Sequence, residues 1–189
     1  HVVRRHSFFS LHHSFTHSQT HKIYFSQKYI RDQSLNETEI VTEFLEAYFS
    51  HTIAPYIQQY LDLWYGQVQS TSFYLGESVP YTSSYLTPEA LLKSARLLNI
   101  SESLADNTTR PRVENMMLST MYVILLRWNE TLAYADSQKV TWPYVSRVAN
   151  EVLEIQFATY YNESGVTHLN EGGHDLKWLR DQINNSSMS

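Results

Sequence analysis

The chain has 189 residues, of which 42% are hydrophobic and 17% are charged, a balance typical of a globular protein rather than a disordered one. The net charge is −5, and the Lys and Arg residues are scattered. They form no basic stripe that could follow a phosphate backbone, so we expect no nucleic-acid partner. No run of about 18 apolar residues is present, so we expect no membrane span. The chain has no cysteine, which excludes disulfides, thiolate zinc sites and thiol nucleophiles.

Residues 1–21 hold six of the 9 histidines and have no helical or alternating pattern. We predict a disordered His-rich leader here, with loose metal binding as the alternative function of such a tract. Its apolar residues are interrupted by His and Ser, so it does not fit a secretory signal. We therefore expect a fragment whose natural N-terminus lies upstream of His1, with residues 22–189 forming one domain.

Two amphipathic helices are predicted between residues 36 and 68, because apolar residues recur there with helical spacing. Asn36 or Ser34 can cap the first helix, and Pro55 suits the first position of the second. The expected inner faces consist of Ile40, Val41, Phe44, Leu45, Tyr48 and Phe49, and then of Tyr56, Ile57, Tyr60, Leu61, Trp64, Tyr65 and Val68.

Residues 70–86 form a long stretch without helical pattern, and loops of this length often serve as lids or contact surfaces. Four aromatic side chains in it are candidates for carbohydrate contact, because flat rings suit the apolar faces of sugars and polar edges suit hydroxyls. These are Phe73, Tyr74, Tyr81 and Tyr85. Burial against the helices is the alternative for all four.

Further helices are predicted at 87–105, 109–136 and 141–161, followed by a short one from His174 to Ile183. Thr87 and Pro88 are typical of a helix start, and Thr141 with Pro143 indicates another. Val145 and Val148 are expected to face inward. The only strand-like segment is 22–25. The predicted fold is all-α, an antiparallel bundle of about five long helices and a short C-terminal one.

The densest polar segment is "GVTHLNEGGHD", from Gly165 to Asp175, with His168, Glu171, His174 and Asp175. Histidine and carboxylate side chains can bind zinc, which leaves a small metal-dependent enzyme as one hypothesis. The spacing matches no metal motif, however, and Gly165 is typical of a helix end. We therefore predict no metal site, and a connector between two helices that is able to contact a neighbouring domain.

Catalytic signatures are weak throughout the chain, and we assign no catalytic residue or cofactor. Glu43 and Glu46 share a helix face, as a pair of glycosidase carboxylates would, but we favour a solvated helix face as their explanation. A Ser-His-Asp triad has no G-x-S-x-G motif to support it.

Seven of the ten asparagines lie in N-x-[ST] sequons, where chance alone would give about two. This excess predicts a secreted glycoprotein, with a Ser/Thr-rich composition as the alternative explanation. The predicted N-glycosylation sites are Asn36, Asn99, Asn107, Asn129, Asn162, Asn184 and Asn185.

The segments 41–66 ("VTEFLEAYFSHTIAPYIQQYLDLWYG"), 85–98 ("YLTPEALLKSARLL") and 112–125 ("RVENMMLSTMYVIL") together carry a resemblance. They resemble the helical C-terminal region of an uncharacterised glycoside-hydrolase-like family related to the alpha-glucuronidases. The resemblance covers about residues 22–183 and depends on helix patterns. The sequence departs from the family at Ser50, where the family has a turn glycine.

The resemblance implies a (β/α)₈ barrel upstream, which would perform the acid/base chemistry on a polysaccharide. The present chain would then be a non-catalytic accessory region of a secreted protein, with the barrel and carbohydrate as its partners. The alternative is a stand-alone extracellular structural or interaction module, because the sequons and the weak catalytic signatures fit that function too.

Overall fold

The computed structural model describes residues 37–71, 80–169 and 173–186. Within these ranges all regular secondary structure is helical, which confirms the predicted fold class. The elements are α3 (Glu37–Phe49), α4 (Ala54–Thr71), α5 (Pro88–Leu104), α6 (Arg110–Leu126), α7 (Trp128–Ser137), α8 (Ala149–Val152), the π-helix η2 (Leu153–Phe157), α9 (Ala158–Ser164) and α10 (Leu176–Ser186). The leader 1–21 and the strand-like segment 22–25 lie outside the described residues.

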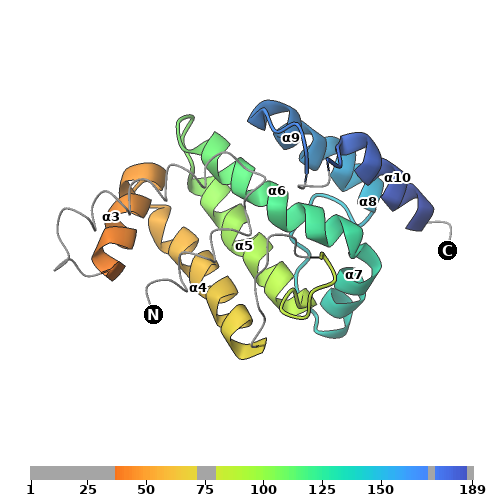
Figure 1. The fold of residues 1–189 in the computed structure, drawn as a ribbon, viewed down its shortest axis with the longest axis horizontal. Coiled ribbons are helices and arrows are strands. Elements are labelled where there is room, and N and C mark those ends of the chain that lie inside the picture. Colours follow the sequence, from red (N-terminus) through yellow and green to blue (C-terminus); the bar gives the residue numbers. More distant parts are fainter. Residues whose placement is uncertain (1–36, 72–79, 170–172, 187–189) are drawn as a thin grey trace.

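Helices α4, α5 and α6 lie side by side with alternating directions and form the centre of the bundle (Figure 1). Helix α3 packs against α4 on one side of this layer, while α9 and α10 pack against α6 on the other. Helix α7 packs against α5. The result is the predicted antiparallel bundle, in which α3 to α6 pack against their chain neighbours, whereas α7 and α9 pack mainly against earlier helices.

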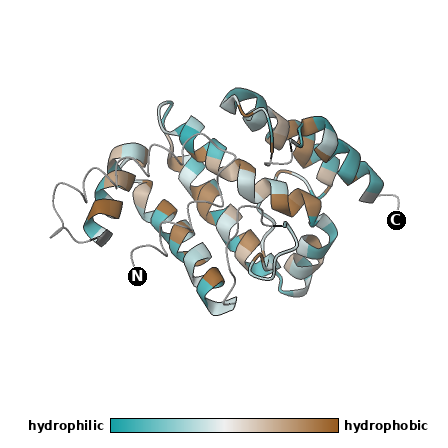
Figure 2. Cartoon of the chain, in the orientation of Figure 1, coloured by the Kyte–Doolittle hydropathy of each residue, from teal (hydrophilic) through white to brown (hydrophobic). Residues whose placement is uncertain are grey.

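The core follows from the amphipathic pattern of the central helices. In Figure 2 hydrophobic residues alternate with hydrophilic ones along α4, α5 and α6, as expected for helices with one buried face. Leu98, Leu118 and Ile124 are fully buried, and Phe157 and Leu179 join them from the C-terminal elements. Each such side chain contributes about 1.5–3 kcal/mol through removal of apolar surface from water.

The connection between α3 and α4 turns at Ser50, which has a left-handed backbone with φ of 78°. Its carbonyl accepts a hydrogen bond from the Ala54 N–H at 3.0 Å, so the turn leads directly into α4. A left-handed residue after a helix end is usually glycine, because a Cβ atom is crowded in this conformation. Ser50 therefore adopts a backbone conformation that is more typical of glycine.

Helix α5 begins as the sequence predicts. The Thr87 hydroxyl accepts a hydrogen bond from the Ala90 N–H at 3.2 Å, and Pro88 occupies the first helical position. The helix ends at Leu104, with Ala105 as the C-cap, so its predicted end near Ala105 is also confirmed.

The single helix predicted over 109–136 is wrong, because the chain breaks at Arg127 into α6 and α7. The Arg127 guanidinium binds the carboxylate of Glu130 at 2.7 and 2.9 Å and donates to the Leu86 carbonyl. Trp128 is buried and meets the Trp142 ring edge-to-face at a centroid distance of 4.9 Å. These contacts reorient the chain at a position where the local sequence contains neither proline nor glycine.

The helix predicted over 141–161 is also only partly present. Residues 141–148 are non-helical, and Val145 and Val148 are 67% and 52% exposed rather than buried. The Trp142 indole N–H donates to the Ser146 carbonyl at 2.7 Å, and Tyr144 is buried against Trp128. Aromatic anchoring of this segment delays the helix to Ala149, and the helical run then continues to Ser164, beyond the predicted end.

Candidate functional site

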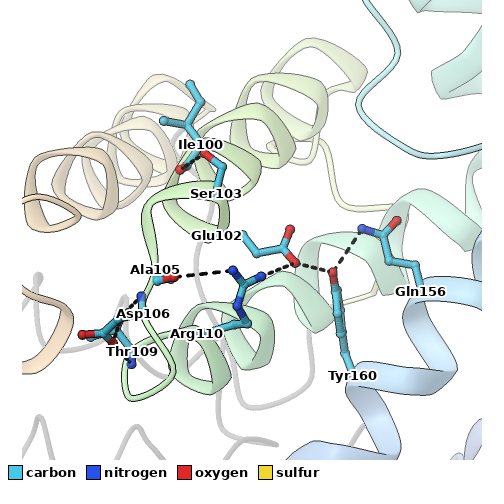
Figure 3. Close-up of polar contacts among 9 residues, drawn as sticks. All are labelled: Ile100, Glu102, Ser103, Ala105, Asp106, Thr109, Arg110, Gln156 and Tyr160. Carbon is cyan, nitrogen blue, oxygen red and sulfur yellow. Dashed lines mark hydrogen bonds and ion pairs between the residues drawn. The ribbon is translucent and has the colours of Figure 1, made fainter.

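A polar cluster joins the C-terminal end of α5, the start of α6 and helix α9 (Figure 3). The Tyr160 hydroxyl donates to Glu102 Oε1 at 2.7 Å, and Arg110 Nη1 lies 3.6 Å from the same oxygen. All three side chains are half-buried. One carboxylate oxygen thus joins two residues from different helices, and charge-assisted hydrogen bonds of this kind are stronger than neutral ones.

The π-helix η2 contributes Gln156 to the same cluster. Its amide nitrogen donates to the Tyr160 hydroxyl at 3.3 Å, while its amide oxygen is buried and has no hydrogen-bond partner among the described residues. Single-turn π-helices are rare and frequently occur at functional sites, because the wider turn places side chains where a regular helix would not. This makes the cluster the best candidate site in the described part of the chain.

The charges of the cluster are mostly negative. Burial, together with the nearby Glu102 and Glu163 carboxylates, raises the pKa of Glu114 above its usual value. Burial and the hydrogen bond to Glu102 likewise raise the pKa of Tyr160. Tyr160 is therefore a stable hydrogen-bond donor near neutral pH, and Glu114 is a carboxyl group whose ionised form is disfavoured by its surroundings.

The turn between α5 and α6 positions Arg110 beside Glu102. Asp106 Oδ1 accepts hydrogen bonds from the N–H of Thr108 at 2.9 Å and from the N–H and hydroxyl of Thr109 at 2.7 and 2.8 Å. The hydrogen bonds from Thr109 hold the pKa of Asp106 below its usual value. An aspartate that satisfies several donors in this way fixes a tight connection, so the first residue of α6 returns next to the last turn of α5.

Sequence reasoning missed this cluster because its members are far apart in the chain, where Glu102 and Tyr160 are separated by 58 positions. A partial signal was present, since Glu102 and Arg110 lie at facing ends of two predicted helices joined by a short turn. The contribution of Gln156 had no signal, because a π-helix cannot be distinguished from an α-helix by hydrophobic periodicity.

The described residues of the segment 165–175 lie between α9 and α10 and form no helix of their own, as expected for a connector. Gly165 ends α9 with a φ of 71°, and Asp175 Oδ1 accepts the Trp178 N–H at 2.8 Å at the start of α10. The His174 ring stacks on the Trp178 ring at a centroid distance of 3.8 Å. His174 and Asp175 precede α10 rather than forming its first turn, because the aspartate acts as the cap.

Of the remaining polar members of that segment, only His168 lies among the described residues. His168 is exposed, and its Nδ1 atom lies 3.0 Å from the Thr167 hydroxyl. Glu171 lies outside the described residues. In the described ranges no three His, Asp or Glu side chains are grouped closely enough to hold a metal ion. A contact between this segment and another domain stays a prediction.

The four aromatic candidates for carbohydrate contact have different positions. Tyr85 is 1% exposed and meets the Trp64 ring edge-to-face, so it belongs to the core and does not present its ring to solvent. Tyr81 is 40% exposed and stays a candidate. Phe73 and Tyr74 lie outside the described residues.

The predicted glycosylation sites also differ in environment. The described asparagines with exposed side chains are Asn107, Asn129, Asn162, Asn184 and Asn185. Asn99 is half-buried, and its side-chain nitrogen donates to the Pro143 carbonyl at 2.5 Å. Asn36 lies outside the described residues.

Comparison with known proteins provides no family for this chain. No protein-family model matches the sequence, no curated protein is significantly similar, and no solved structure matches the fold. None of the described helices is long and apolar enough to cross a membrane.

Proposed function

We propose that these helices form a non-catalytic accessory region that packs against a neighbouring domain of a secreted, carbohydrate-processing protein. The segments that resemble the glycoside-hydrolase-like family coincide with real helices, namely α3, α4, α5 and α6. The resemblance also implies that acid/base chemistry belongs to a barrel upstream of His1. The present chain would stabilise that barrel.

The observation that carries the proposal is an exposed aliphatic segment before and within η2. Val145, Val148 and Ile155 are 67%, 52% and 62% exposed. Val148 immediately precedes α8, and Ile155 lies seven residues later within η2. Single exposed aliphatic residues are ordinary, but several large ones within eleven residues support a contact surface.

The polar groups of the bundle support the same proposal, because they have structural partners. Glu102 binds Tyr160 and Arg110, Asp175 caps α10, and Glu154 binds Arg180 through two hydrogen bonds of 2.6 and 2.7 Å. Carboxylates held in this way connect helices instead of facing a substrate. Contact with carbohydrate would come from the exposed Tyr81 at the edge of the long loop.

The test begins with the coding sequence upstream of His1, where we expect a (β/α)₈ barrel. The barrel and the 189-residue chain are then produced separately, and their association is measured by calorimetry. Replacing Val145, Val148 and Ile155 with Asp should weaken binding at least tenfold. The matched control replaces the exposed Ile100 and Leu104 of α5 with Asp and should leave binding unchanged. A transcript without a barrel, or equal effects of both variants, would overturn the proposal.

The second candidate is a stand-alone extracellular interaction module, because the same aliphatic segment could join copies of the chain. Sedimentation of the purified chain distinguishes the two functions. A dimer or larger assembly that dissociates when Val145, Val148 and Ile155 become Asp would favour the module. A monomer at high micromolar concentration would count against it.

A further inference from the structure

The six sequon asparagines that the structure describes are not equivalent acceptors for a glycan. N-linked sugar is attached to the side-chain nitrogen, so a folded glycoprotein needs that atom at the surface and free to leave its neighbours. Asn107 lies in the α5–α6 turn and Asn99 lies eight residues earlier, within α5. The two differ most clearly in how accessible their side-chain nitrogens are.

Asn107 is exposed in a turn whose geometry does not depend on its side chain. The hydrogen bonds that hold the turn run from Thr108 and Thr109 to Asp106 Oδ1, and the Asp106 N–H donates to the Thr109 hydroxyl at 3.1 Å. A glycan on Asn107 would therefore extend into solvent without breaking a contact that defines the α5–α6 connection.

Asn99 is part of the packing between α5 and the segment 141–148. Its side-chain nitrogen donates to the Pro143 carbonyl at 2.5 Å, and its side-chain oxygen is buried. The third residue of its sequon, Ser101, is fully buried and donates to the Leu97 carbonyl at 2.9 Å. A sugar on this nitrogen would have to occupy the space between α5 and Pro143, and would displace the aromatic segment that follows.

We infer that the folded chain carries an N-linked glycan at Asn107 and excludes one at Asn99. The inference rests on the secretion that is part of the proposed function. The sequon pattern treats Asn107 and Asn99 alike, whereas their environments in the folded chain distinguish them. The α5–α6 turn is therefore a glycosylated end of the bundle.

The experiment directs the full chain through the secretory pathway of eukaryotic cells with an added signal sequence. The secreted, folded fraction is deglycosylated enzymatically in ¹⁸O-labelled water, and occupancy of each sequon is read by peptide mass spectrometry. We expect Asn107 to be occupied and Asn99 to be unoccupied. Either an empty Asn107, or an occupied Asn99 in a fraction with the helix content of the unglycosylated chain, would overturn the inference.

Two matched variants make the result specific. Asn107→Gln should remove one glycan from the secreted protein, whereas Thr109→Ser keeps the sequon and the hydroxyl and should retain it. Asn99→Gln should leave the mass of the attached sugar unchanged. Glycosidase treatment of the natural protein is a separate measurement, and resistance there, together with the expected pattern in the directed chain, would refute natural secretion while leaving the site selection intact.

Discussion

The two halves of the bundle differ in what determines their helix boundaries. From α3 to α6 the boundaries coincide with local signals, such as the cap at Thr87 and the Asp106 turn. From Arg127 to Val148 they are set by contacts with residues far away in sequence, including Arg127 with Leu86 and Asn99 with Pro143. Hydrophobic periodicity thus predicts which residues face the core. Helix ends that lack a local capping signal are instead set by contacts with residues from other segments.

The strongest test of this difference is Trp128→Ala, which removes the centre of the Trp128, Trp142 and Tyr144 cluster. We expect a loss of about 3–5 kcal/mol in the free energy of unfolding, because a large buried aromatic side chain is replaced by a cavity. Urea denaturation followed by circular dichroism measures it. Val145→Ala, at an exposed neighbour in the same segment, is the control and should change little. Equal effects would show that the cluster does not hold the segment.

Thr87→Ala tests a local signal in the first half. The substitution removes the hydroxyl that accepts the Ala90 N–H, and helix caps of this type contribute about 1 kcal/mol. Urea denaturation should show this smaller loss in the free energy of unfolding for Thr87→Ala. Thr87→Ser retains a hydroxyl and should therefore keep most of the wild-type stability. If serine were as destabilising as alanine, the cap would not be the cause.

Ser50→Gly should stabilise the protein by about 0.5–1 kcal/mol, because glycine adopts the left-handed conformation without the crowding of a Cβ atom. Ser119→Gly is the control, since it lies within α6, where glycine should destabilise by a similar amount. A thermal melt of both variants measures the opposite shifts, and a downward shift for Ser50→Gly would contradict the assigned turn.

Glu114→Gln should have the smallest effect, and the size of that effect depends on pH. The folded pKa of Glu114 is raised above its usual value of 4.5 by burial and by Glu102 and Glu163, so its contribution to stability is complete below pH 4.5 and is lost as pH rises through the folded pKa. Glutamine cannot ionise, so the variant should melt slightly higher than the wild type at pH 7, with the difference shrinking toward pH 4.

Glu130→Gln is the opposite control for that titration. The hydrogen bond from Arg127 lowers the pKa of Glu130, so its contribution is present above pH 4.5 and is lost as pH falls through the folded pKa. This variant should melt lower than the wild type at pH 7 and approach it in acid. The same sign for both variants at pH 7 would contradict the opposite pKa shifts assigned to Glu114 and Glu130.

Some residues of the candidate sites could be assigned from local sequence signals, whereas others are brought together only by helix packing. Gly165 could be assigned from sequence as a helix end, because a left-handed glycine acts on its own neighbours in the chain. The cap at Asp175 starts α10 at Leu176, two residues after the predicted start at His174. The cluster of Glu102, Arg110 and Tyr160 could not, because hydrogen bonding between separate helices depends on how those helices pack.

The sequence by itself determined the helical class, the antiparallel order and most of the buried residues of α3 to α6, since these follow from spacing along one chain segment. Only the tertiary structure decided the break at Arg127, the non-helical segment 141–148 and the π-helix that contains Gln156. The physical reason is that local conformational preferences differ by about 1 kcal/mol or less per residue. Burial of an aromatic cluster contributes several times that amount and therefore overrides them.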